Sequence, residues 1–174
     1  LSTTNITVTD QVTKAQADII NAYTTGQVVL NSSSMTVAEL AAVEALNDSE
    51  MKFADDGAIS VSDAATKANA DTINAYTTGQ VTLTSVSDTV ANITSIDGLT
   101  TSEVTMATAD VSITDTGATK TQVDNVNAFT TGTVTPTSVT EDRADITTLQ
   151  GTAGISLSTT NITVTDQVTK AQAD

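Results

Sequence analysis

The chain has 174 residues, 39% of them apolar, which is enough to build a core and argues against a wholly disordered protein. It has no Cys and no His, so it lacks the thiolate and imidazole groups that most enzymes use as nucleophile, base or zinc ligand. The net charge of −15 disfavours nucleic acid and anionic lipid as partners, and no apolar run is long enough to predict insertion into a membrane.

The first predicted element is a short strand followed by a helix cap. Residues 6–9 alternate apolar side chains with threonine, which is typical of a half-buried strand. Asp10 follows at the position expected of a helix N-cap. The strand and its aspartate recur twice along the chain, with Asp63 and Asp115 in the place of Asp10.

A predicted helix comes next and ends before a glycine. Its apolar residues recur every three positions, on a narrow face that suits packing against a sheet: Ala17, Ile20 and Tyr23, then Ala70, Ile73 and Tyr76, then Val123, Val126 and Phe129. Gly26, Gly79 and Gly132 take the C′ position, where a positive φ favours glycine.

Polar residues also recur on this helix. Asn21, Asn74 and Asn127 predict a ladder of amide hydrogen bonds to the backbone of the next coil. A lysine and an aspartate lie four residues apart in each copy, as Lys14 and Asp18, Lys67 and Asp71, and Lys120 and Asp124. This spacing predicts solvated ion pairs within the helix, and the alternative is a Lys–Asp ladder between neighbouring units that fixes their register.

The rest of each unit predicts a second strand, a shorter helix and a third strand. The second strand is clearest at 81–84, and the shorter helix has apolar positions aligned within 35–43, 88–96 and 141–149. The third strand is expected at 51–53, 104–106 and 155–157. The resulting β-α-β-α-β units average about 52 residues and divide the chain into 1–58, 59–110 and 111–161.

Two adjacent aspartates form the best candidate metal site. Asp55 and Asp56 lie in the turn that ends the first unit, and calcium prefers carboxylate and carbonyl oxygens. Asp10, Asp63 and Asp115 could add carboxylates at the strand ends, although capping explains them without a metal. The sequence contains no EF-hand loop, and we expect no other cofactor.

The two ends of the chain carry the same sequence. Residues 157–174 are identical to residues 1–18 at every position, which fixes a longer period of 156 residues. Three divergent units make one such period, and residues 162–174 begin the next. Because Leu1 is not an initiator Met, we expect the chain to be an internal or excised segment of a tandem array.

Two architectures fit this order of elements. In the first, parallel strands stack and helices cover them, which gives a repetitive β/α solenoid. In the second, each unit folds as a separate small α/β bead. We favour the solenoid, because a unit of this size without disulfides or metal and with at most one core aromatic buries too little surface to be stable alone.

The repeat pattern resembles a known kind of protein. Units of the type I-x-V-x-D, A-x-x-I-N-A-Y-T-T-G-x-V and S-D-T-V-A-N-I are similar to those of giant tandem-repeat bacterial, including cyanobacterial, surface and extracellular-matrix proteins of the large-adhesin kind. The resemblance implies an extracellular or cell-surface stalk, sheath or fibre. We therefore expect a structural protein, not an enzyme, that self-associates along or between its repeats. The alternative is an adhesin module that binds carbohydrate or a cell-surface partner, with calcium as a possible requirement.

Overall fold

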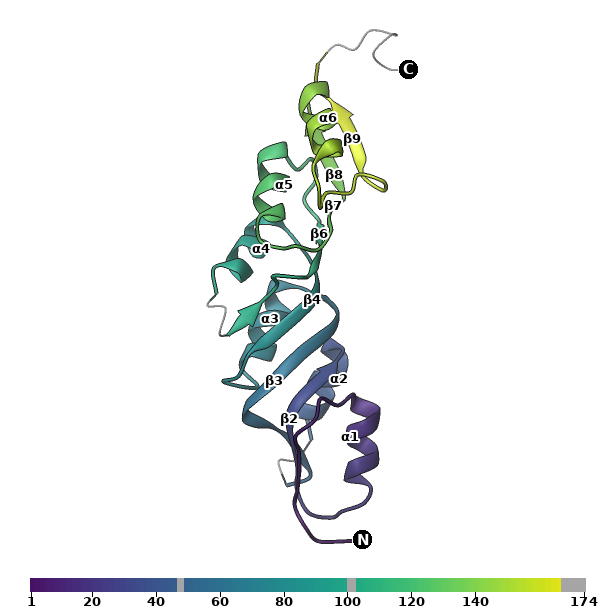
Figure 1. The fold of residues 1–174 in the computed structure, drawn as a ribbon, viewed down its shortest axis with the longest axis vertical. Coiled ribbons are helices and arrows are strands. Elements are labelled where there is room, and N and C mark those ends of the chain that lie inside the picture. Colours follow the sequence, from purple (N-terminus) through teal and green to yellow (C-terminus); the bar gives the residue numbers. More distant parts are fainter. Residues whose placement is uncertain (47–48, 100–102, 167–174) are drawn as a thin grey trace. The chain divides into compact units, whose positions relative to one another are not determined.

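The structure is a computed structural model that describes residues 1–46, 49–99 and 103–166. It has a mixed α/β fold in which strands and helices alternate along the chain and the sheet is mostly parallel (Figure 1). The chain forms two compact units. Unit 1 comprises residues 1–85 and 96–106, and unit 2 comprises residues 86–95 and those from 107 onward.

Unit 1 contains the first strands and helices in chain order. Its strands are β1 (Ile6–Val8), β2 (Val28–Met35), β3 (Met51–Ala65), the first part of β4 (Val81–Asp88) and β5 (Val104–Thr105). Its helices are α1 (Lys14–Asn21), α2 (Val37–Glu44) and α3 (Lys67–Asn74). Neighbouring strands in its sheet follow the order β1, β2, β3, β4, and β5 pairs with β4.

Unit 2 continues the same alternation. It contains the end of β4, most of helix α4 (Val90–Asp97), and the elements β6 (Asp110–Ile113), α5 (Lys120–Asn127), β7 (Val134–Pro136), β8 (Ser138–Glu141), α6 (Arg143–Gly151) and β9 (Asn161–Val164). Strand β6 pairs with β7, and β8 pairs with β9.

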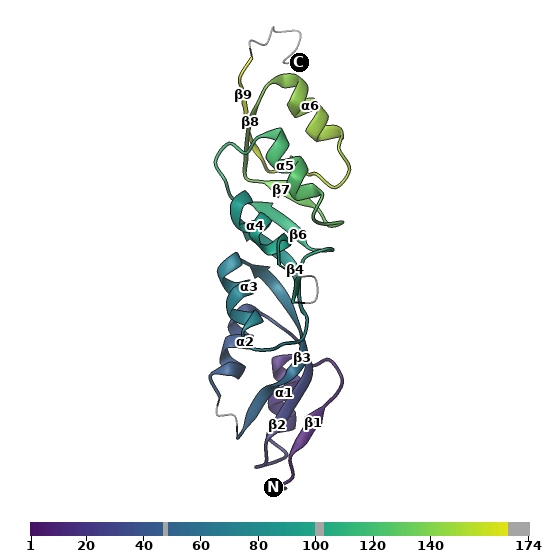
Figure 2. The same cartoon turned by 90° about the vertical axis from the view of Figure 1, so that its left-hand side faces the viewer.

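Every strand pair whose register is described is parallel. Parallel neighbours need a crossover between them, and the helices supply it. Within unit 1, α2 contacts both α1 and α3, and Figure 2 shows α2 and α3 on the same side of the sheet. The α/β class expected from the sequence is therefore confirmed.

The core lies between the sheet and the helices. Every second residue at the start of β2 is buried, with Val28 at 0% and Leu30 at 1% exposed, because alternate side chains of a strand point to opposite faces. Leu40 and Val43 of α2 meet this layer and are fully buried. Full burial of each such side chain contributes about 1.5–3 kcal/mol, so these apolar positions fix which face of the helix packs inward.

Capping boxes start the helices. The Thr13 hydroxyl accepts the N–H of Gln16, and the Gln16 side chain accepts the N–H of Thr13 at 2.9 Å. Thr36, Thr66 and Thr119 begin α2, α3 and α5 in the same way. The prediction that Asp10, Asp63 and Asp115 are the N-caps of the helices that follow them was therefore wrong. A threonine three residues after Asp10 and Asp63, and four after Asp115, forms the reciprocal box with the residue three positions further on.

The third predicted strand forms in the first two units: residues 104–106 contain the separate strand β5, whereas residues 51–53 begin a longer strand. The predicted strands at 51–53 and 59–61 lie within the single strand β3, along which Leu30 pairs with Phe53 and Ser32 with Ala58. Four residues of β3 therefore bulge opposite one residue of β2. Near 155–157 only an isolated bridge between Val134 and Ile155 forms. The predicted β-α-β-α-β order is therefore found in the first two units, with the third strand of the first unit continuous with β3, and the third unit lacks its last strand at 155–157.

Within the described ranges, none of the helices has both the length and the apolar character needed to span a bilayer.

Candidate functional site

The most regular feature of the described residues is a turn that follows every second helix and forms hydrogen bonds to the preceding strand segment. We name these the Thr-Thr-Gly turns; they comprise residues 24–26, 77–79 and 130–132. The first threonine of each turn is buried, at 5%, 7% and 8% exposure. A buried hydroxyl needs hydrogen-bond partners, so its contacts report what the turn does.

In unit 1 the middle turn holds the bulge of β3. The Thr77 hydroxyl donates to the carbonyl oxygen of Gly57 at 2.6 Å and accepts the N–H of Gly79 at 2.8 Å. The N–H of Thr78 donates to the carbonyl oxygen of Asp55 at 2.7 Å. One turn thus satisfies two carbonyl groups of a segment about twenty residues earlier.

The first turn makes the same contacts. The Thr24 hydroxyl donates to the carbonyl of Thr4 at 2.6 Å, and the N–H of Thr25 donates to the carbonyl of Ser2 at 2.7 Å. The N–H of Gly26 donates to the Thr24 hydroxyl at 2.8 Å.

The third turn repeats them in unit 2. The Thr130 hydroxyl donates to the carbonyl of Ala109 at 2.7 Å, and the N–H of Thr131 donates to that of Ala107 at 2.8 Å. The N–H of Gly132 donates to Thr130 at 2.9 Å. The sequence analysis recognised this motif but gave its threonines no role. The signal for a role was that two adjacent threonines recur in all three copies, outside the alternation of apolar residues and threonine that marks the strands.

The glycine of each turn is required by close approach and not by its φ angle. A Cβ on Gly26 would lie 2.6 Å from the carbonyl oxygen of Thr4, and one on Gly79 or Gly132 would meet Asp56 or Ala109 still more closely. Positive φ occurs among the described residues only at Gly117 and Gly154. The predicted C′ role of Gly26, Gly79 and Gly132 was therefore wrong. The helices end at Asn21, Asn74 and Asn127, and the glycine comes later, where the backbone passes the previous strand.

Acidic side chains form a second set of links between segments. The N–H of Val37, the first residue of α2, donates to Oδ1 of Asp63 at 2.8 Å. The N–H of Val90 in α4 donates to Oδ2 of Asp115 at 2.6 Å. In unit 2, Glu141 and Asp166 accept the first N–H groups of α5 and α6 at 2.7 and 2.9 Å. Each acid therefore caps a helix that lies 21 to 26 residues earlier in the chain.

The predicted asparagine ladder is seen at one position. The Asn127 amide donates to the carbonyl oxygen of Ala153 at 3.2 Å, 26 residues later. For Asn21 and Asn74 the same offset leads to positions 47 and 100, which lie outside the described residues. At these two positions the ladder stays a prediction.

The recurring lysines pair within their own helices. Lys14 Nζ lies 2.6 Å from Asp18, and Lys67 and Lys120 each lie 2.5 Å from Asp71 and Asp124. The hydrogen bond that Lys120 donates to Asp124 raises the pKa of Lys120 above its ordinary value. These contacts support the solvated ion pairs expected within each helix over a ladder between units.

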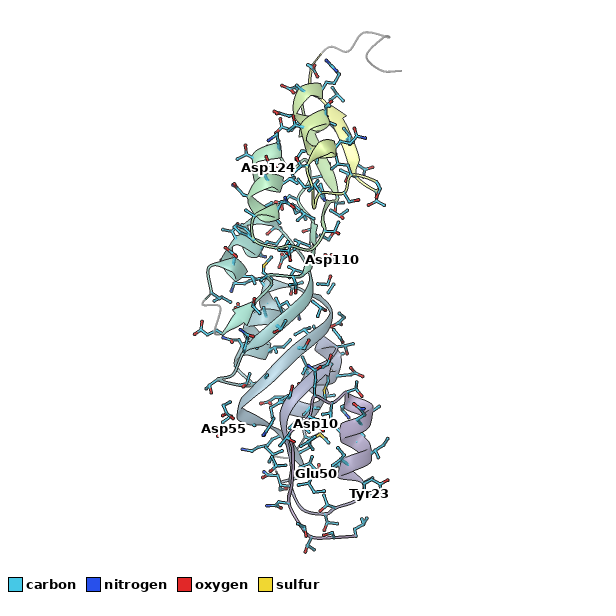
Figure 3. The ribbon with its side chains drawn as sticks, in the orientation of Figure 1. Asp10, Tyr23, Glu50, Asp55, Asp110 and Asp124 are labelled. Carbon is cyan, nitrogen blue, oxygen red and sulfur yellow. The ribbon has the colours of Figure 1, made fainter. Side chains whose placement is uncertain are left out.

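The candidate calcium site lies in the bulge of β3. Asp55 (labelled in Figure 3) exposes 92% of its side chain and lies 3.4 Å from Lys52 Nζ. Asp56 is also exposed. Within the described ranges no three Asp or Glu residues gather into a possible metal site. Asp55 and Asp56 are thus two neighbouring exposed carboxylates, and calcium binding there stays a prediction.

An aromatic pair lies next to the bulge of β3. The rings of Phe53 and Tyr76 stack with their centroids 6.1 Å apart and an interplanar angle of 8°. Burial raises the pKa of the Tyr76 hydroxyl above its ordinary value of 10.0, and the nearby carboxylate of Glu44 raises it further. The pair joins the start of β3 to the residues that follow α3.

These contacts connect segments to one another, and the first turn also lines a hollow of about 210 Å³ with Asn21 and Glu50. No family model matches the sequence, and no curated protein or solved structure is similar to it.

Proposed function

We propose that this chain is part of an extracellular structural protein in which tandem units stack into a β/α solenoid and so form a stalk, sheath or fibre. The observation that carries the proposal is the recurrence of the Thr-Thr-Gly contacts. Three buried hydroxyls, Thr24, Thr77 and Thr130, each hold the carbonyl groups of the preceding segment with nearly the same distances. A contact that recurs at every second strand–helix segment can be added without limit, which is the property of a solenoid.

The strand order supports the same proposal. In unit 1 neighbouring strands follow chain order, so each new segment adds to the edge left by the last one. The acidic caps also join neighbours that the turns do not join, as Asp63 of β3 does for Val37 of α2. Stiffness along the array would then come from many copies of a small interface, and each further unit would add length instead of a new activity.

Length per period separates the solenoid from the beads. Chains with one, two and three 156-residue periods can be measured in electron micrographs. One period contains six strand–helix segments, and stacking at a strand spacing of about 4.8 Å gives about 30 Å per period. Separate beads of about 52 residues would each measure about 25 Å and give roughly 75 Å per period. A rise near the larger value would reject the solenoid.

Location needs its own test. An antibody raised against the folded chain should label intact, unpermeabilised cells of the source organism. Labelling that requires permeabilisation would reject an extracellular role.

A further inference from the structure

Two short segments of this chain have the same sequence and different partners. Residues 1–10 and 157–166 are identical, and they form β1 and β9. Strand β1 pairs with β2, whereas β9 pairs with β8 (Figure 2). One sequence is therefore seen in two settings, each with a different edge occupied.

The pairing with β8 uses one edge of this sequence. Ser138 pairs with Asn161, and the ladder continues to Glu141 and Val164. The N–H of Asn161 donates to the carbonyl of Thr137 at 3.0 Å, and that of Thr165 donates to Glu141 at 3.0 Å. Residues 161, 163 and 165 therefore direct their backbone groups toward β8.

The pairing of β1 with β2 uses the opposite edge. The N–H of Ile6 donates to the carbonyl of Gln27 at 2.8 Å, and Ile6 pairs with Val28. Because successive residues of a strand direct their N–H groups to opposite edges, Asn5, Thr7 and Thr9 direct theirs away from β2. These three residues are the counterparts of Asn161, Thr163 and Thr165. Strand β1 is an edge strand among the described residues.

Among the described residues, the aspartate that follows the repeated strand is paired at one end of the chain and unpaired at the other. Oδ1 of Asp166 accepts the first N–H of α6, from Arg143, at 2.9 Å. Asp10 is the identical residue beside β1, and it is exposed. Its carboxylate has no hydrogen bond to any part of the chain that the structure describes.

Apolar side chains are left partly uncovered beside both strands. Ile20 of α1 is half-buried and lines a hollow of about 370 Å³ with Val8 and Ile19, whereas its counterparts Ile73 and Val126 are 1% and 0% exposed. If a neighbouring segment covered this hollow, Ile20 would be buried like its counterparts, and the apolar contact of α1 would increase.

Helix α6 also has an apolar side chain that is only partly covered. Ile146 is half-buried and lines a hollow of about 400 Å³ with Ile155 and Ile162. Its counterparts Leu40 and Ile93 are 0% exposed. In both hollows, therefore, an apolar residue is partly exposed whose counterparts elsewhere in the chain are covered by a neighbouring segment.

We propose that β8 and α6 form a docking site for residues 1–10 of a second copy of this chain, which pairs there as β9 does. When β9 is released from this site, copies join head to tail, with Asp10 of the incoming copy capping α6. This inference rests on the proposed function and identifies its junction and its partner. Within one chain β9 occupies the site at a high effective concentration, so docking between chains requires that β9 be released.

The test uses the full chain with one backbone change. Thr163→Pro removes the N–H that faces β8, so β9 should dissociate and leave β8 free. Light scattering should then show oligomers that grow with concentration, whereas the wild type and Thr163→Val stay monomeric. The double variant Thr7→Pro, Thr163→Pro should be monomeric, because Pro at position 7 removes the equivalent N–H of the incoming strand. Thr7→Pro alone should fold, since the N–H of Ile6, on the other edge, still pairs with Gln27.

A labelled peptide of residues 157–174 gives a second measurement. It should bind the Thr163→Pro variant, dissolve its oligomers and leave the wild type unbound. A folded, monomeric Thr163→Pro chain, oligomers that persist in the double variant, or aggregates that the peptide does not dissolve would each overturn the proposal. None of these results bears on the length per period of a continuous array, so failure here is distinguishable from failure of the proposed function.

Discussion

Asp63 caps a helix that begins 26 residues before it: its Oδ1 accepts the N–H of Val37 at 2.8 Å. The first N–H groups of a helix have no partner within the helix, and the helix dipole places positive charge there. A carboxylate from the next segment satisfies both needs. Residues that resemble local caps in the sequence therefore link one segment of the chain to the next.

Replacing this carboxylate should weaken the link between segments. We expect Asp63→Ala to lower the free energy of unfolding by about 1 kcal/mol, because the Val37 N–H loses its acceptor at a helix N-terminus. Asp56→Ala removes an exposed carboxylate of the same charge and should change stability by less than about 0.5 kcal/mol. Urea denaturation followed by circular dichroism measures both. Equal effects would show that Asp63 acts only through net charge.

The buried threonine of the middle turn should matter more. Thr77→Val keeps the shape of the side chain but leaves the carbonyl of Gly57 and the N–H of Gly79 without the hydroxyl. We expect a loss of about 1–3 kcal/mol, the usual cost of unpaired buried polar groups. Thr72→Val is the matched control, since the Thr72 hydroxyl is exposed and bonds only within its helix. If both variants melt at the same temperature, the turn does not hold the bulge.

The two kinds of glycine should respond in opposite directions to alanine. A Cβ at Gly79 would lie 2.5 Å from the carbonyl oxygen of Gly57, and the backbone must shift to admit it. We expect Gly79→Ala to cost about 1–3 kcal/mol through this overpacking. Gly151, at the end of α6, has nothing within 4 Å of an added Cβ, so Gly151→Ala should be neutral or slightly stabilising. Thermal melts of the two variants give the comparison, and a stable Gly79→Ala would contradict the close approach.

The sequence predicted the elements better than the links between them. Alternation and three-residue spacing located the strands and helices, since these periods follow from which face is buried. The N-caps were misplaced because Asp10 and Thr13 are both good cap residues, and only the reciprocal bond with Gln16 decides between them. The bulge at Asp55 has the composition of a turn, and local composition does not reveal whether the strand continues beyond it.

Ser33 is a polar residue at a position where the other two copies of the repeat have valine. Its hydroxyl is buried and has no hydrogen-bond partner among the residues that the structure describes, while Val86 and Val139 occupy the equivalent positions and are 0% exposed. Ser33→Val removes the unpaired group and fills the same space with apolar atoms, so we expect a gain of about 1–2 kcal/mol. Ser33→Ala separates the two effects, since it removes the hydroxyl without adding a methyl group. A destabilised Ser33→Val in chemical denaturation would mean that the space around Ser33 is too small for valine.

Tyr76 should make stability fall in alkaline solution. Burial, and to a lesser extent Glu44, raises the pKa of its hydroxyl in the folded chain, so the unfolded chain loses this proton first. Above about pH 10 the folded state therefore binds more protons, and its free energy of unfolding decreases as pH rises. Tyr76→Phe keeps the ring beside Phe53 and removes the ionisable group, so its melting temperature should fall less steeply over this range while matching the wild type near neutral pH. Parallel curves for the two proteins from neutral to alkaline pH would show that the Tyr76 hydroxyl does not titrate differently in the folded chain.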